Sequence, residues 1–142
     1  MAGIHHEIKI HGTPERIREA LGDEVALEAW HGGRVTGGPG ERRFDFADGA
    51  PSFRWVVLRG DSPHRVVWRC LEGPGDAPGT EASFTLSPAD KGRTLVEFAH
   101  TGWPHTDGNY RKCNTLWAVL LHHLRQFVET GQAAPALRRP SP

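Results

Sequence analysis

The sequence predicts an α+β domain with a curved antiparallel sheet of about six or seven strands. Two short helices lie near the start of the chain, and one long C-terminal helix packs across the sheet. Three observations lead to this fold class. Apolar side chains alternate with period two in several short runs between residues 4 and 100. Gly and Pro clusters separate these runs, as in a meander of antiparallel strands. Over residues 110–129 the apolar period becomes that of a helix.

The first strand and the first helix follow each other directly. Residues 4–10 alternate apolar and polar side chains, which is typical of a half-buried strand. Thr13 stands before Pro14, and a Thr cap followed by Pro at the first helical position favours a helix start. We expect this helix to end near Leu21.

A second short helix follows at once. Asp23 is a suitable N-cap for a helix from Glu24 to Ala29. The apolar positions of this helix are expected at Val25, Leu27 and Trp30.

The middle of the chain predicts six more strands. The first two form a hairpin around the Gly-Gly-Pro-Gly turn at residues 37–40. The predicted strands cover residues 34–36, 41–46, 52–59, 64–72, 80–87 and 94–100. Trp103 follows the last strand and is expected in a loop at one end of the C-terminal helix, where it could gate a cavity.

The C-terminal helix carries a wide apolar stripe and is predicted to end at Gly131. The stripe consists of Tyr110, Cys113, Trp117, Leu120, Leu121, Leu124 and Val128. A curved sheet needs cover for its apolar concave face, and this helix can supply it. A helix laid across a curved sheet leaves a space, which is either a filled core or an open pocket. Residues 132–142 are expected to be a short disordered tail.

Composition excludes several classes of protein. The 142 residues suit one domain, and 17 Lys and Arg balance 17 Asp and Glu, so a nucleic-acid partner is not expected. No apolar run is long enough for a membrane span, and no secretory signal is visible, so we expect a cytoplasmic protein. The sequence contains no glycine-rich motif of the kind that binds nucleotide phosphates, so we expect no nucleotide and no other cofactor.

Metal and thiol chemistry are not expected either. Cys70 and Cys113 lie far apart and without metal-ligand spacing, so both should be free thiols. Adjacent His pairs at residues 5–6 and 122–123 point in different directions and cannot chelate well, and no metal site is expected.

Several motifs in order resemble a known family. They are the Ile-x-Ile-x-Gly-Thr-Pro-Glu-Arg-Ile run at 8–17, Leu-Glu-Ala-Trp at 27–30, Val-Val-Trp-Arg-Cys at 66–70, the run at 94–103 ending in His-Thr-Gly-Trp, Cys-Asn-Thr-Leu-Trp at 113–117, and Glu-Thr-Gly at 129–131. The chain resembles the START-like and polyketide-cyclase-like superfamily called SRPBCC. Within it, the chain is most similar to the branch named after the activator of the heat-shock ATPase. His31 is a departure, because many relatives carry an aromatic residue there.

The resemblance implies a helix-grip fold, in which members bind apolar or amphipathic molecules between sheet and helix. Some members are cyclases or hydrolases, and others are carriers; the branch name implies a chaperone activity. The aromatic and inward-facing residues give the candidate ligand site. These candidates are Trp30, Trp55, Trp68, Phe84, Phe98, His100, Trp103, Tyr110, Cys113, Trp117 and Leu121. Each of them could instead be core.

Three functions remain open. The first is binding of a small apolar or aromatic molecule by a monomer or homodimer. The second is a cyclase-type or hydrolase-type enzyme with His100 as the candidate acid or base, since an ordinary imidazole titrates near neutral pH. The third is a co-chaperone-like interaction module. A large cavity would favour the first two, and a filled core with a bare apolar patch would favour the third.

Overall fold

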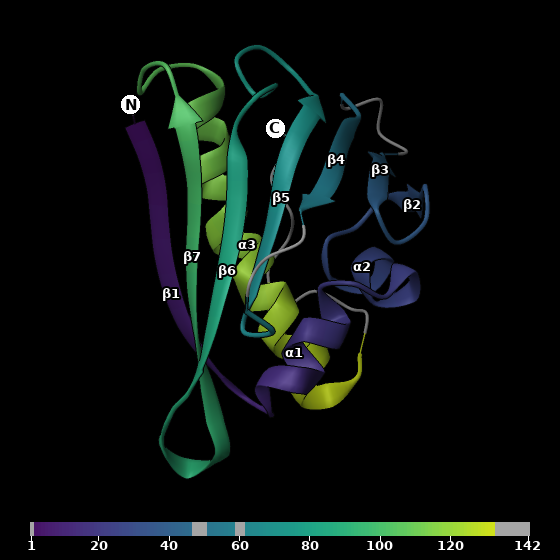
Figure 1. Cartoon of the computed structure of the whole chain (residues 1–142), viewed down its shortest axis with the longest axis vertical. Coiled ribbons are helices and arrows are strands. Elements are labelled where there is room, and N and C mark those ends of the chain that lie inside the picture. Colours follow the sequence, from purple (N-terminus) through teal and green to yellow (C-terminus); the bar gives the residue numbers. More distant parts are fainter. Residues whose placement is uncertain (1, 47–50, 59–61, 133–142) are drawn as a thin grey trace.

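The computed structural model describes residues 2–46, 51–58 and 62–132 (Figure 1). These residues form one antiparallel sheet, three α-helices and one short 3₁₀ helix, η1 (Asp90–Gly92), between β6 and β7. The seven strands run in the order β1-β7-β6-β5-β4-β3-β2. The predicted fold class is therefore confirmed. The strands are β1 (Ala2–His11), β2 (Arg34–Thr36), β3 (Glu41–Asp45), β4 (Phe53–Leu58), β5 (Arg65–Glu72), β6 (Glu81–Pro88) and β7 (Arg93–Trp103). The helices are α1 (Pro14–Ala20), α2 (Glu24–Trp30) and α3 (Asn109–Thr130).

Both short helices begin at the predicted caps. The Thr13 hydroxyl accepts the backbone N–H of Arg16 at 3.2 Å, with Pro14 in the first turn. The Asp23 carboxylate accepts the backbone N–H of Ala26 at 2.9 Å. Each cap satisfies one of the N–H groups that a helix start leaves unpaired.

The apolar face of α2 differs from the prediction at one position. Val25 is 74% exposed, whereas Leu27 and Trp30 are buried. Ala26, one position later, is the third buried residue of the helix. Leu27 and Trp30 are three residues apart and share a face, but Val25 lies about 200° around the helix from Leu27.

Strand β7 is longer than predicted. It runs through Gly102, which has a φ of 93°, to Trp103, which is 1% exposed. The expectation that Trp103 lies in a loop is therefore wrong. Glycine accommodates this positive φ without a Cβ penalty, so the strand continues through a residue that reads as a break.

Helix α3 lies across the inner face of the sheet and makes its main backbone approaches to β1, α2 and α1 (Figure 1). Its C-terminal end is held by two hydrogen bonds. The backbone N–H of His11 donates to Glu129 at 2.8 Å, and Arg16 donates to the Val128 carbonyl at 2.9 Å. The predicted stop is confirmed, since Gly131 caps the helix in the left-handed conformation.

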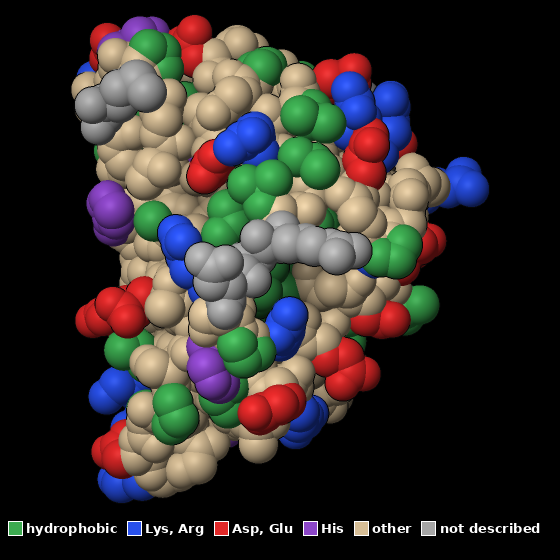
Figure 2. Space-filling model, viewed as in Figure 1, with side chains coloured by type: hydrophobic (Ala, Val, Ile, Leu, Met, Phe, Trp, Pro, Cys, Tyr) green, Lys and Arg blue, Asp and Glu red, His purple; other side chains and the backbone are tan. Residues whose placement is uncertain are grey.

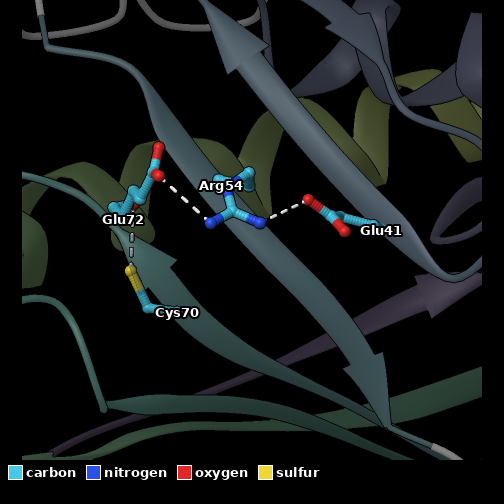
Figure 3. Close-up of polar contacts among 4 residues, drawn as sticks. All are labelled: Glu41, Arg54, Cys70 and Glu72. Carbon is cyan, nitrogen blue, oxygen red and sulfur yellow. Dashed lines mark hydrogen bonds and ion pairs between the residues drawn. The ribbon is translucent and has the colours of Figure 1, made fainter.

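The outer face of the sheet carries charged side chains in pairs (Figure 3). Arg54 on β4 lies between Glu41 on β3, at 2.5 Å, and Glu72 on β5, at 3.0 Å. These hydrogen bonds raise the pKa of Arg54 and lower that of Glu72. Figure 2 shows charged side chains of both signs interspersed over one face of the molecule.

Two further expectations concern a membrane span and the C-terminal tail. Among the described residues, no helix is both long and apolar enough to cross a membrane. The predicted tail falls almost wholly on residues 133–142, which lie outside the described residues.

Candidate functional site

A small cavity lies between the N-terminal half of α3 and the inner face of the sheet. Its volume is about 10 Å³, which is about the space that one water molecule needs. The sheet, α3 and the end of α2 all contribute to its wall. The lining residues are His31, Phe53, Trp55, His100, Cys113, Leu116, Trp117 and Leu120.

Aromatic rings fill most of the space around this cavity. The ring centroids of Phe98 and Trp117 are 4.4 Å apart, which joins β7 to α3. Phe84 follows at 5.1 Å from Phe98, and Trp68 at 5.2 Å from Phe84. Such tilted and edge-to-face contacts are the favoured geometries for aromatic pairs. The space between helix and sheet is thus mainly packed core.

One polar network crosses this aromatic interior. The indole N–H of Trp117 donates to Nδ1 of His100 at 3.0 Å, while Nε2 of His100 lies 2.7 Å from the Thr80 hydroxyl. That hydroxyl itself donates to the Ala77 carbonyl at 2.6 Å. Its proton is therefore used, and it must accept from His100. The network assigns a neutral imidazole with its proton on Nε2.

Burial has a strong effect on the same imidazole. His100 is 0% exposed, and loss of hydration lowers its pKa to about 3. Both ring nitrogens are already hydrogen-bonded, so His100 can exchange a proton with a bound molecule only if one of these bonds breaks.

Three indole N–H groups of this interior have no hydrogen-bond partner among the described residues. They belong to Trp55, Trp68 and Trp103, and all three nitrogens are buried. By contrast, the Trp30 indole donates to the Ala20 carbonyl at 2.8 Å. A buried donor without an acceptor lowers the stability of the fold by about 1–3 kcal/mol. Each of these three N–H groups could therefore donate a hydrogen bond to a bound molecule.

The structure brings some of the predicted site residues together. Trp55, His100, Cys113 and Trp117 lie on the cavity wall. Trp68, Phe84 and Phe98 form the layer behind that wall.

Four other predicted site residues lie elsewhere. Trp30 and Leu121 are buried in the core, away from the cavity lining. Trp103 packs against Tyr110, with ring centroids 6.1 Å apart, near the N-terminal end of α3. Tyr110 is half-buried there.

The candidate list missed four residues of the wall. His31 is one of them, at the position where the sequence departs from the family pattern. Phe53 could have been found by period two, because it lies two residues from Trp55 on the same strand. Leu120 belongs to the predicted helical stripe, and Leu116 lies three residues from Cys113.

The two cysteines are free, as predicted, and the structure shows that both are buried. Burial raises the pKa of Cys70 to about 12, with a further contribution from Cys113, and raises that of Cys113 to about 11. Both thiols are therefore protonated at neutral pH and poor nucleophiles. Within the described part of the chain, no cluster of three or more His, Cys, Asp or Glu side chains could hold a metal ion.

Comparison with solved structures finds the same fold in several proteins. The Aha1 dimer from Colwellia psychrerythraea is 33% identical, with a TM-score of 0.78 over 92% of this chain and 98% of that one. DynU16, a protein of the dynemicin biosynthetic locus, is 20% identical with a TM-score of 0.76; 94% of this chain spans about half (49%) of that one. CV1439 from Chromobacterium violaceum is 22% identical with a TM-score of 0.74, over 91% of this chain and 99% of that one.

No curated protein matches the chain. The model of one family, described as activator of Hsp90 ATPase homolog 1-like protein, matches residues 11–129, which is most of the sequence. The Aha1 dimer from Colwellia psychrerythraea is also similar in sequence, over 92% of this chain and 98% of that one. The chain therefore belongs to the activator of Hsp90 ATPase homolog 1-like family, within the superfamily that its motifs resemble.

Proposed function

We propose that the protein binds a small hydrophobic or aromatic molecule with a hydrogen-bond acceptor, between α3 and the inner face of the sheet. The observation that carries this proposal is the indole N–H of Trp55, which is buried, has no acceptor among the described residues and belongs to the cavity wall. A ligand carbonyl or ether oxygen would supply that acceptor, while its apolar part would replace aromatic contacts.

Such a ligand must widen the cavity, because drug-sized sites measure about 300–1,000 Å³ and this one about 10 Å³. We infer that the N-terminal half of α3 moves. That end begins at Gly108 without a side-chain cap, and Tyr110 ties it to the Gly3 carbonyl at 3.0 Å. The opposite end accepts two hydrogen bonds, one from the backbone N–H of His11 to Glu129 and one from Arg16 to the Val128 carbonyl. In this proposal the arrangement described here is the closed one, and ligand entry requires the N-terminal end of α3 to move away from the sheet.

An enzymatic role for His100 has less support. A general base works best with a pKa near the operating pH, whereas burial holds the pKa of His100 at about 3. Ligand entry would have to break a hydrogen bond to Thr80 or Trp117 before proton transfer could begin.

A protein-interaction role is the alternative that the nearly filled interior favours. It needs an apolar or charged docking face, and the large hydrophobic side chains exposed on the described residues are Val25 and Leu71.

The dimeric Aha1 neighbour supports a homodimer as the first partner to test, by light scattering during gel filtration. The two free thiols support a reducing cytoplasm as the site of action.

Two ligands of nearly equal shape test the binding proposal. Indane is apolar, and 1-indanone adds a carbonyl oxygen. Each is titrated into ¹⁵N-labelled protein while the five indole cross-peaks are followed by NMR. We expect 1-indanone to shift the Trp55 indole signal and to bind about three- to tenfold more tightly than indane, because one neutral hydrogen bond contributes about 0.5–1.5 kcal/mol.

Two variants provide the matched comparison. Trp55→Phe keeps an aromatic ring without the donor and should abolish the preference for 1-indanone. Trp30→Phe is the control, because its N–H is already bonded to Ala20 and its loss should leave the preference intact. The binding proposal fails if neither compound shifts an indole signal up to its solubility limit, or if the preference survives in Trp55→Phe.

A further inference from the structure

A second hollow of the molecule lies between the α1–α2 connection and the ends of β4 and β5. It is a groove of about 440 Å³, and none of its lining residues belongs to the small cavity under α3. Aliphatic side chains and arginines line it together. The lining residues are Arg18, Leu21, Gly22, Pro39, Arg42, Val57, Leu58, Arg65 and Val66.

Arg42 is the unusual residue of this groove. It lies on β3 and is only 7% exposed, although a buried guanidinium is rare without a full set of partners. One of its terminal nitrogens donates to the Gly22 carbonyl. The other is 3.7 Å from the Glu24 carboxylate, which is beyond hydrogen-bond distance. A guanidinium has five N–H donors, so the hydrogen bond to Gly22 and the ion pair to Glu24 leave donors of Arg42 that a bound anion could use.

Arg42 forms an ion pair with Glu24, but the other two arginines of the groove pair with no described carboxylate. Arg18 donates to the Pro63 carbonyl at 2.8 Å, which leaves its charge unneutralised. Arg65 is exposed and forms no ion pair or side-chain hydrogen bond with a described residue. The Glu24 carboxylate that pairs with Arg42 is half-exposed and does not line the groove. Among the described lining residues three are arginines and none is acidic, so this lining carries an excess of positive charge.

The remaining lining is suited to a short apolar group. Val57 and Val66 are partly exposed and lie on neighbouring strands at the same end of the sheet. Leu58 and Leu21 continue this aliphatic surface toward the α1–α2 connection. An anionic head close to an apolar tail matches this arrangement, because guanidinium forks bind carboxylate and phosphate oxygens in pairs.

We propose that this groove binds a small amphipathic anion, a carboxylate or phosphate monoester bearing a short alkyl or aryl group, with the head on Arg42 and Arg65 and the tail on Val57, Leu58 and Val66. The site is independent of the ligand proposed under α3. The two proposals can therefore succeed or fail separately.

The test uses hexanoate, hexyl phosphate and the neutral control 1-hexanol, each titrated into ¹⁵N-labelled full-length protein. We expect both anions to shift the amide signals of Gly22, Val57 and Val66 and the side-chain Nε–H signal of Arg42. The five indole signals should stay in place. The dissociation constants for the anions should rise with salt, because head-group binding is electrostatic. 1-Hexanol should bind at least tenfold more weakly.

Arg65→Gln is the main variant, because Arg65 is exposed and its loss should leave the fold intact. We expect it to weaken anion binding about three- to tenfold, and Arg42→Gln to weaken it more. Arg69→Gln is the matched control, since Arg69 lies on the same strand with the same charge but pairs with Glu81 outside the groove.

Three results would overturn the proposal. Equal binding of 1-hexanol and hexanoate would remove the role of the charge. Shifts confined to the indole signals would move the anions to the cavity under α3. An unchanged affinity in Arg65→Gln would dismiss the arginine groove, even if Arg42→Gln failed to fold.

Discussion

The indole of Trp117 on α3 donates a hydrogen bond to Nδ1 of His100 on β7, across 3.0 Å and within a wholly buried interior. This bond links the helix to the sheet at the wall of the small cavity. It also fixes which nitrogen of His100 carries the proton, because Nδ1 must accept. Protonation of His100 would turn Nδ1 into a donor facing another donor.

The stability of the protein should therefore depend on pH through His100. Its folded-state pKa is about 3, below the ordinary value of 6.5, so between these values the unfolded chain binds one more proton. The free energy of unfolding should fall as the pH decreases through this window, by about 1.4 kcal/mol per pH unit from this group alone. Urea denaturation of the wild type and of His100→Gln between pH 7 and pH 3.5 would measure the effect. The stability difference between them should narrow as the pH falls; a constant difference would contradict the prediction.

Replacement of Trp117 should be severe, because this side chain is only 3% exposed. Trp117→Ala should lower the free energy of unfolding by about 3–5 kcal/mol, through lost contacts and a new cavity. Trp117→Phe should cost about 1–3 kcal/mol, since it leaves Nδ1 of His100 without its donor. Val25→Ala, at an exposed position, is the control and should stay within about 0.5 kcal/mol. A mild Trp117→Ala would mean that the interior is already open in solution.

Both thiols should be protected in the folded protein. Burial raises the pKa of Cys70 to about 12 and that of Cys113 to about 11, so few thiolates exist at pH 8. A chromogenic disulfide reagent should react slowly with native protein and should release two equivalents after unfolding, without added reductant. Rapid reaction of one thiol in the native state would indicate an opening of the interior beside it.

Arg54 should control the ionisation of Glu72. The hydrogen bond between them lowers the pKa of the Glu72 carboxyl, so its stabilising effect is present above the unfolded-state pKa and is lost as pH falls through the lower folded-state value. Arg54→Gln should return this pKa toward 4.5, as measured by ¹³C NMR of the carboxyl carbon. Arg69→Gln, at a pair formed with Glu81 on the same outer face, should leave Glu72 unchanged.

Much of the fold could be predicted because local patterns agreed with the tertiary structure. The period of 4–10, the caps Thr13 and Asp23, and the stripe of α3 each indicate one element, and each is present. The extension of β7 was missed because Gly102 reads as a break, although its positive φ allows the strand to continue. Val25 was misplaced because a seven-residue helix is too short for its apolar face to be defined by period alone.

The state of the site could be predicted less well. Period two and the helical stripe placed Trp55, His100 and Trp117 inside, but the volume of the cavity depends on how side chains from four elements fill one space. The unpartnered indole of Trp55 and the donors of Arg42 depend on which acceptors come within about 3 Å. Sequence periodicity carries no information on such distances.

The pairing of β1 with β7 has a consequence for the synthesis of this protein. Ile10 lies opposite Thr94 and Ile4 opposite His100, so the first strand meets a partner that leaves the ribosome more than eighty residues later. Contacts this distant in sequence cost loop-closure entropy and slow folding relative to the local hairpins of β2 to β6. A nascent chain that ends before residue 93 contains β1 without its neighbour β7 and without α3. The apolar inner face of β1 therefore stays exposed until the last third of the polypeptide has been synthesised.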